Sequence, residues 1–242
     1  LELRRHKYEL KRANQLLEDK NSMLEKFASL AATDIKSPLN NIRNTYLSFL
    51  KSYRLQIDRQ GQDMLSTIYD ATRKLTSLVD GLKKSSRAEA TIKSSKSRVK
   101  LKAIHDDITK LYPASDDYRI YFFFQDRTIF TNRLALQQIL INLVSNAIKY
   151  NDKVIAEVEV GSREDERFYE FFVSDNGPGI RPEDQDRIFE MFSVLQTVDR
   201  YGEYSTGIGL ASVKKLVKEL GGEISVDSDE GVGSIFTFSL AK

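Results

Sequence analysis

Two asparagines spaced four residues apart, Asn142 and Asn146, are the first residues in this sequence whose type and spacing suggest chemistry. Residues four apart share one face of a helix, and asparagine is a mediocre choice for a helix interior because its amide competes with the backbone. With Lys149 and Tyr150 close behind, this face could hold a hydrated Mg²⁺ and phosphate groups. Taken alone, the segment could also be the polar edge of an ordinary helix.

A glycine-rich turn is predicted directly after a strand, in the segment Asp175-Asn-Gly177-Pro-Gly179-Ile180. Its glycines allow the backbone to turn tightly and to approach a ligand closely. Asp175, at the end of the strand, can accept a hydrogen bond from a ligand amine. An ordinary Asn-Gly and Pro-Gly turn is the simpler alternative for this segment alone.

Two further glycine motifs follow. The segment Ser205-Thr206-Gly207-Ile208-Gly209-Leu210 opens a helix, where unpaired N–H groups and the helix dipole favour phosphate. It lacks the Gly-Lys-Ser/Thr of a Walker A loop, and the acidic residue of a dinucleotide-binding fingerprint is not cleanly placed. The segment Gly231-Val-Gly233-Ser234-Ile-Phe236 predicts a glycine turn into a strand, which a plain hairpin would explain nearly as well.

Mixed helices and strands from Leu101 onward must position these four motifs. The apolar periodicity predicts helices over 104–111, 133–149 and 206–220, the last stopped by two glycines. The predicted strands are 120–124, 154–160, 168–174, 223–227 and 234–240, with the last two forming a closing hairpin. Helices on one face of a mixed sheet make a two-layer α/β domain.

The front of the chain has a helical pattern. Leucines recur every seven residues at the d position of a heptad pattern, and two asparagines occur at its a position. This is typical of a parallel two-stranded coiled coil, with a single surface helix as the alternative. The d positions are Leu3, Leu10, Leu17 and Leu24, and the a positions are Lys7, Asn14, Asn21 and Ala28. The helix continues past Pro38, which should kink it, turns near 56–61 and returns over 64–82. Two such helices have too little partner surface alone, so we expect a dimeric four-helix bundle.

Composition sets the expected domain boundaries. Ten of the twelve glycines lie between Gly161 and Gly233, and the Ser- and Lys-rich stretch 85–100 is typical of a linker with a short strand near its end. The expected fold class is therefore α+β. The expected parts are a signalling coiled-coil helix (1–26), a dimerisation hairpin (27–88), a linker (89–100) and the two-layer α/β domain (101–242).

Composition also excludes several kinds of site. The 242 residues include no Cys, which excludes disulfides, Cys-ligated zinc, iron–sulfur clusters and thiol catalysis, and only two His, His6 and His105, which argues against a multi-His metal site. No apolar run reaches the roughly 18 residues of a membrane span, so we expect a soluble piece. Because the chain starts at Leu1 without a signal segment, we expect it to be part of a longer protein.

Charge is distributed unevenly. Residues 1–99 contain 20 Lys and Arg against 11 Asp and Glu, whereas residues 100–242 contain 17 against 24. A basic front half could attract nucleic acid or an acidic protein, with a solvated helix surface as the alternative. The basic residues are interleaved with acids and leucines, so we do not expect nucleic acid as a partner.

The order and spacing of the four motifs together resemble the N, G1, G2 and final glycine motifs of the GHKL ATPase superfamily, and Ile188-Phe189-Glu-Met-Phe192 resembles the F motif between them. Within that superfamily the chain is most similar to sensor histidine kinases. The segment Phe27-Ala-Ser-Leu-Ala-Ala-Thr33-Asp34-Ile-Lys-Ser37-Pro38-Leu39 resembles the motif around their phosphoacceptor. The resemblance covers nearly the whole chain and implies a dimerisation and phosphotransfer hairpin followed by an ATP-binding domain.

The resemblance implies how the adenine end of ATP or ADP would be held. Asp175 would bind the adenine amino group, and Tyr150 would pack near the ring. A mobile lid over 193–204 would cover the nucleotide, anchored by Phe189 and Phe192. The other residues implied at this end are Gly177, Gly179, Ile180 and Ser234.

The resemblance likewise implies a phosphate end. Asn146 would coordinate Mg²⁺ with help from Asn142, and Lys149 would approach the phosphates. Phosphoryl transfer would then rest on positioning and on neutralisation of charge by Mg²⁺. The residues implied to contact phosphate, mainly through their backbone, are Thr206, Gly207, Ile208, Gly209 and Leu210.

The sequence departs from the family at two positions. Thr33 stands where the family has its phosphoacceptor His, and neither His6 nor His105 can easily replace it. A threonine hydroxyl is a weak nucleophile near pH 7 without a positioned base, so we expect no autophosphorylation and no ordinary His-to-Asp phosphorelay. Thr33 would be either an engineered replacement or the mark of a natural degenerate kinase. Ser205 stands where the family usually has Gly and would stiffen the lid.

The implied function is the ATP-binding core of a two-component sensor histidine kinase. Asp34 matches an acidic residue that assists the acceptor, and Ser37 matches a polar position that orients water when a partner regulator is dephosphorylated, so retained phosphatase activity is a hypothesis. The alternative is a natural pseudokinase or a dimeric nucleotide-sensing scaffold without phosphoryl transfer. The paired front helices argue against other GHKL ATPases such as chaperones and topoisomerases.

The implied partners are a second copy of the chain, through the front helices, and the receiver domain of a response regulator. A receiver presents an acidic pocket, which suits the basic front half. An upstream sensor domain would lie outside this piece. We expect a cytoplasmic location, with no direct membrane contact by this fragment.

Overall fold

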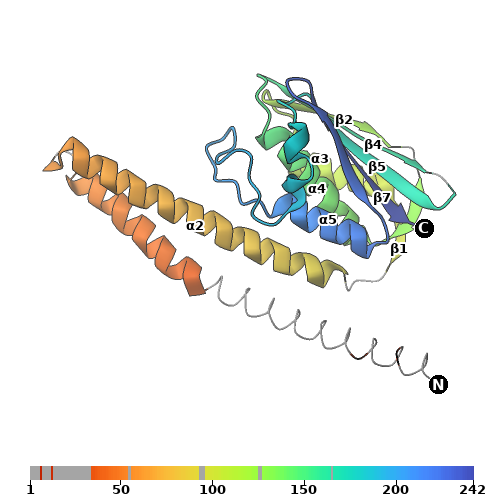
Figure 1. Cartoon of the computed structure of the whole chain (residues 1–242), viewed down its shortest axis with the longest axis horizontal. Coiled ribbons are helices and arrows are strands. Elements are labelled where there is room, and N and C mark those ends of the chain that lie inside the picture. Colours follow the sequence, from red (N-terminus) through yellow and green to blue (C-terminus); the bar gives the residue numbers. More distant parts are fainter. Residues whose placement is uncertain are drawn as a thin grey trace. The chain divides into compact units, whose positions relative to one another are not determined.

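The structure is a computed structural model that describes residues 6, 12, 34–53, 56–92, 96–124, 127–164 and 166–242. It divides the chain into two compact units, Leu1–Ser86 and Arg87–Lys242 (Figure 1). The coiled coil predicted over 1–26 lies outside the described residues except for His6 and Arg12, which are helical.

The first unit contains an antiparallel helical hairpin. One helix covers residues 34–53, and α2 spans Arg59–Ile92. Lys36 Nζ lies 2.6 Å from Asp80 Oδ1, and nearer the turn the Tyr46 and Tyr69 rings stack at 4.4 Å. A later residue of the first helix thus contacts an earlier residue of α2, so the two helices run in opposite directions, as predicted.

Apolar side chains stay exposed along this hairpin. Leu39 and Thr72 are buried, but two helices cannot enclose both apolar stripes. The large apolar side chains left exposed are Ile35, Ile42, Leu47, Phe49, Tyr53, Met64, Ile68 and Leu75. The four-helix bundle predicted to cover them stays a prediction.

Helix α2 extends further than the sequence pattern indicated. It starts at Arg59 because Asp58 Oδ1 accepts the N–H of Gly61 at 2.8 Å and caps the first turn. At its far end it continues to Ile92, and β1 follows at Ser97–Lys100. The stretch expected to be a linker, 89–100, therefore carries regular structure at both ends. The boundaries between domains stay predictions.

The second unit is the predicted two-layer α/β sandwich. Its sheet has the order β2-β4-β5-β7-β6; β2 and β4 are parallel, and the other neighbours are antiparallel. The helices α3 (Leu101–Leu111), α4 (Arg133–Lys149) and α5 (Gly209–Glu219) cover one face of this sheet (Figure 1). The strands are β2 (Tyr118–Phe123), β4 (Ala156–Glu164), β5 (Phe168–Asp175), β6 (Ile224–Asp229) and β7 (Gly233–Ala241).

A second, two-stranded sheet pairs β1 with β3 (Thr128–Thr131) in antiparallel register. The sequence predicted a short strand near β1 but missed β3, whose four residues are too few for a periodic signal. Two single turns of 3₁₀ helix, η2 (Pro182–Asp184) and η3 (Arg187–Phe189), follow β5.

The core of this unit lies between the sheet and the helices. Alternate residues of β4 are buried, and the Phe171 and Phe238 rings stack at 5.1 Å across β5 and β7. The seven apolar residues whose periodicity predicts this helix are all buried: Leu136, Ile139, Leu140, Leu143, Val144, Ala147 and Ile148.

Candidate functional site

Helix α4 places the two asparagines on its less buried side. The helix begins at Arg133, as predicted, because Asn132 caps it by accepting the N–H of Ala135 at 3.1 Å. Its apolar face packs on the sheet, which leaves Asn142 and Asn146 half-buried at the opposite edge. Asn142 Oδ1 accepts a hydrogen bond from Gln138 at 3.3 Å.

The start of α5 lies opposite Asn146. A Cβ atom placed on Gly209, the first residue of α5, would lie 4.0 Å from Asn146 Oδ1. The N-terminal N–H groups of α5 therefore lie beside an amide oxygen of α4. Ile208, the residue before α5, is 2% exposed, so its side chain belongs to the interior and only its backbone can serve this site.

Asp175 ends β5 as a largely buried carboxylate. Burial raises its pKa to about 6 from the ordinary 3.8, although backbone hydrogen bonds from Gly177 and Ser234 act in the opposite direction. The N–H of Gly177 donates to Asp175 Oδ1 at 2.9 Å. A buried carboxylate that has no cationic partner within the described part of the chain is suited to a ligand that brings its own hydrogen-bond donor.

A serine pair fixes the turn that follows Asp175. Ser234 lies beside Asp175 in the β5–β7 register, and its hydroxyl lies 3.0 Å from that of Ser228 on β6. The Ser228 hydroxyl also donates to the carbonyl of Gly233 at 2.7 Å and accepts the N–H of Ile180 at 2.8 Å. Sequence reasoning missed Ser228, because nothing in β6 marks one serine of an alternating strand as different from another.

An asparagine pair joins α4 to the same turn. Asn151, just after α4, is 4% exposed, and its amide donates to Asn176 Oδ1 at 2.9 Å and to the carbonyl of Ala147 at 3.4 Å. Asn176 Oδ1 also accepts the N–H of Glu157 on β4. Asn176 was predicted only as a turn residue, and Asn151 was not singled out, because their pairing becomes visible only when the helix end meets the strand end.

Two glycines of the motifs are required by close packing. Gly179 has φ +72°, and a Cβ there would lie 2.0 Å from the carbonyl oxygen of Asp229. Gly207 has φ +64°, and a Cβ there would lie 2.5 Å from backbone atoms of Phe192 and Ser193. Side chains at either position would strain the backbone and force the adjoining strands or lid apart.

The predicted lid folds as a small hairpin. Val198 and Tyr204 form an isolated antiparallel bridge, and the N–H of Ser205 donates to the carbonyl of Thr197 at 2.9 Å. Asp199 Oδ1 accepts the N–H groups of Tyr201 and Glu203, both at 2.9 Å, and so closes the tip.

The hairpin is attached to the C-terminal end of α4. Asp199 Oδ2 lies 3.4 Å from Lys149 Nζ, with the Asp199 side chain 3% exposed. The N–H of Arg200 donates to the carbonyl of Lys149 at 2.9 Å, and its guanidinium donates to the carbonyls of Lys153 and Val154. Lys149, predicted to meet phosphate, therefore pairs with a carboxylate of the lid.

The two aromatic residues expected to anchor the lid behave differently. Phe189 packs edge-on against Phe236 at 6.3 Å, with Lys214 Nζ 5.3 Å from its ring. Phe192 is 57% exposed with φ +65°, and its N–H donates to the carbonyl of Gly207 at 2.9 Å. Phe192 is therefore connected to the far end of the lid through its backbone, and its role as an anchor of the lid stays a prediction.

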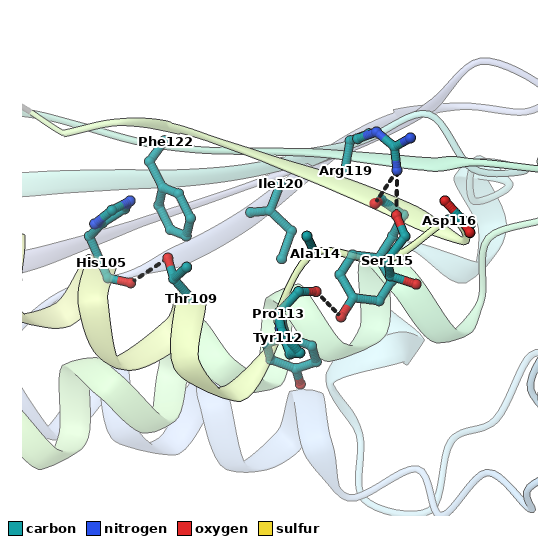
Figure 2. A pocket seen from close by; sticks show the side chains of 11 residues that line it. His105, Thr109, Tyr112, Pro113, Ala114, Ser115, Asp116, Arg119, Ile120 and Phe122 are labelled. Carbon is teal, nitrogen blue, oxygen red and sulfur yellow. Dashed lines mark hydrogen bonds between the residues drawn. The ribbon is translucent and has the colours of Figure 1, made fainter.

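A hollow of about 530 Å³ opens between α3 and β2 (Figure 2). His105 lines it, with its ring edge-on to Phe122 at 4.4 Å and Nδ1 3.0 Å from Asp106 Oδ1. Tyr118 donates its hydroxyl to the carbonyl of Pro113 at 2.8 Å across the same hollow. None of the residues predicted to bind nucleotide lines it.

The phosphotransfer residues predicted in the front half belong to the first unit. Asp34 and Ser37 are exposed on the helix 34–53, whereas Thr33 lies outside the described residues. Across the described part of the chain, no three His, Cys, Asp or Glu side chains group as they would around a metal ion. None of the helices within those same described residues is both long and apolar enough to cross a membrane.

Comparison with known proteins finds relatives among ATPases and histidine kinases. Residues 131–242 match the family model of the histidine kinase-, DNA gyrase B- and HSP90-like ATPases. Cyanobacterial phytochrome B of Nostoc sp. (strain PCC 7120 / SAG 25.82 / UTEX 2576) is 32% identical over 235 residues, 96% of this chain and 31% of the relative. The methanogenesis regulatory histidine kinase FilI of Methanothrix harundinacea (strain 6Ac) is 29% identical over 243 residues, 99% of this chain and 27% of the relative.

The fold is similar to that of a solved structure. Full-length ShkA, solved in complex with AMPPNP, superimposes with a TM-score of 0.61 over 89% of this chain and 45% of that one, at 23% identity. The chain thus spans less than a third of the length of these two curated relatives. Residues 131–242, the range matched by the family model, carry α4, the Asp175 turn, the lid and α5, and over this range the chain is similar to the histidine kinase-, DNA gyrase B- and HSP90-like ATPases.

Proposed function

We propose that this chain binds ATP with Mg²⁺ between α4, the Asp175 turn and the 206–210 segment, as the nucleotide-binding core of a sensor histidine kinase. The observation that carries the proposal is the convergence of the motifs on the C-terminal half of α4. Asn151 is bonded to the turn through Asn176, Gly209 faces Asn146, and the lid contacts Lys149. Together they supply a hydrogen-bond acceptor, amide oxygens and free backbone N–H groups.

Asp175 is the residue we assign to the adenine. Its carboxylate is largely buried, and among the described residues its hydrogen-bond donors are the backbone N–H groups of Gly177 and Ser234. The exocyclic amine of adenine is a neutral donor that would bond to one of the remaining lone pairs. Tyr150, half-buried at the end of α4, would pack near the ring, and Ser234 with Ser228 keeps the carboxylate in place.

The phosphates would lie between α4 and the start of α5. Mg²⁺ prefers oxygen ligands, takes one or two from the protein and the rest from phosphate and water. Asn146 Oδ1 beside Gly209 fits that donor set, with Asn142 one helical turn away. When bound, the metal would neutralise phosphate charge, and the N-terminal N–H groups of α5 would donate to the phosphate oxygens.

Base selectivity tests this assignment most simply. Guanine carries a carbonyl oxygen where adenine carries its amine, so it would place an acceptor against the Asp175 carboxylate. We expect ATP to bind at least about a hundredfold more tightly than GTP, because an unpaired buried polar group is strongly rejected. Calorimetric titration of this chain with both nucleotides measures the ratio, and equal affinities would remove Asp175 from the adenine site.

The acceptor position limits what the core can do. Thr33 stands where histidine kinases carry their phosphoacceptor, and a threonine hydroxyl has no comparable nucleophilicity near pH 7. We propose that the chain binds ATP without phosphorylating itself, whether Thr33 is engineered or natural. Asp34 and Ser37 are exposed, which leaves open a phosphatase activity toward a phosphorylated regulator. Phosphate release no faster than spontaneous loss would remove that activity.

The alternative function is a dimeric scaffold that senses nucleotide without phosphoryl transfer. The exposed apolar stripe of the hairpin favours a dimer in either case. As partners we propose a second copy of the chain and the acidic receiver domain of a response regulator, attracted by the basic front half. A cytoplasmic location belongs to the same proposal.

A further inference from the structure

Asp199 has two carboxylate oxygens with different contacts. Oδ1 accepts two backbone N–H groups and shapes the tip of the lid hairpin. Oδ2 faces Lys149 Nζ at 3.4 Å, and the whole carboxyl group is 3% exposed. The turn therefore needs only one oxygen, and the other is left to hold a cation.

Lys149 has no other acidic partner among the ion pairs of the described residues. The Lys149 side chain is still 44% exposed, so a second anion could reach it. A phosphate group carries more negative charge than a carboxylate and bonds readily to an ammonium. Asp199 thus pairs with the positive charge that the proposed function assigns to phosphate.

The hairpin does not depend on this ion pair for its attachment. Arg200 donates its N–H to the carbonyl of Lys149 and its guanidinium to the carbonyls of Lys153 and Val154. The Val198–Tyr204 bridge holds the two strands of the hairpin together. Breaking the Asp199–Lys149 pair therefore releases Lys149 without unfolding the lid.

We propose that Asp199 is a positioning residue that competes with the nucleotide phosphates for Lys149, so that the lid lowers phosphate affinity until a nucleotide displaces it. The inference rests on the proposed function, because it needs ATP at this site. It deepens that function by giving the lid a part in setting affinity for the phosphate end and none in holding the adenine.

The test is Asp199→Asn, which keeps an amide oxygen for the turn and removes the charge that holds Lys149. Asp199→Ser, whose hydroxyl can also close such a turn, is the second variant should the first fold poorly. We expect ATP to bind about fivefold more tightly to either variant, the size of a partly exposed ion pair, and adenosine to bind unchanged. Asp107→Asn is the matched control, since it removes one charge from an ion pair with Arg133.

Removing any negative charge near the phosphates would also strengthen ATP binding by reducing repulsion. Making Asp199→Asn in a protein that also carries Lys149→Gln separates this general effect from the release of Lys149. If Asp199 acts through Lys149, Asp199→Asn changes ATP affinity less than twofold once Lys149 is replaced. A fivefold gain that persists in that background would overturn the inference, as would unchanged or weaker ATP binding by Asp199→Asn alone. If the parent chain binds no ATP, the proposed function fails and the inference with it.

Discussion

Replacing Asp175 by asparagine should stabilise the protein while it destroys nucleotide binding. The carboxyl group has its pKa raised to about 6 from 3.8 by burial. That difference corresponds to about 3 kcal/mol by which the charged group disfavours the folded state at neutral pH. An asparagine oxygen can still accept the N–H of Gly177, so the turn should survive the change.

The sign of the pH dependence follows from the direction of the shift. Because the folded-state pKa is raised, the folded protein holds this proton more tightly, and its stability falls as the pH rises from about 4 through about 6. Below pH 4 the Asp175→Asn variant and the parent should have similar stability. At pH 7.5 we expect the variant to be more stable by about 1–3 kcal/mol, since part of the gain is lost to imperfect hydrogen bonding.

Calorimetric melting of the parent and of Asp175→Asn at pH 4.5 and 7.5 measures the difference in stability of the second unit, Arg87–Lys242. Asp227→Asn, at an exposed position of β6, is the control and should shift the melting temperature little at either pH. The reasoning is refuted if Asp175→Asn destabilises the protein at pH 7.5, or if its gain does not grow with pH. ADP binding by the same variant should fall below detection.

Three further outcomes follow from the site. Adenosine, which carries no titrating phosphate, should bind about tenfold more weakly at pH 5 than at pH 7.5, because Asp175 must be ionised to accept its amine; a pH-independent constant from calorimetric titration would contradict this. Asn146→Ala should abolish the enhancement of ATP affinity by Mg²⁺ and leave adenosine binding unchanged, which titrations with and without the metal would measure. The Ser205 hydroxyl is buried with no partner among the described residues, so Ser205→Ala should raise the stability of the free protein by about 1 kcal/mol, and a lower melting temperature would show that the hydroxyl has a bonding role.

The elements with a long, regular pattern could be predicted from the sequence. Helix α4 begins and ends where its apolar spacing placed it, and the β6–β7 hairpin follows its glycine turn. Short β3 could not be predicted, because its pairing with β1 decides it and local preference does not. The extension of α2 to Ile92 could not be predicted either, because packing overrides local helix preference there.

The site was predictable as a set of motifs and not as a set of contacts. The order of Asn146, Asp175 and Gly209 indicated one nucleotide site, and the fold brings their segments around one helix end. The partners that hold these residues, such as Asn151 and Ser228, lie in segments with no signal of their own. The pairing of Lys149 with Asp199 joins positions 50 residues apart through a hairpin whose register no pattern in the sequence fixes.

Transfer of the γ-phosphoryl group of ATP tests the central claim most directly. This chain and its Thr33→His variant would be incubated with Mg²⁺ and ATP labelled on the γ-phosphate, with Asp175→Asn added to the variant as a binding-deficient control. We predict an acid-labile, alkali-stable label on Thr33→His alone, because an imidazole at position 33 would supply the phosphoacceptor of the proposed kinase core. If Thr33→His binds ATP and still gains no label, the chain is not a competent kinase core and is better described as a nucleotide-sensing scaffold.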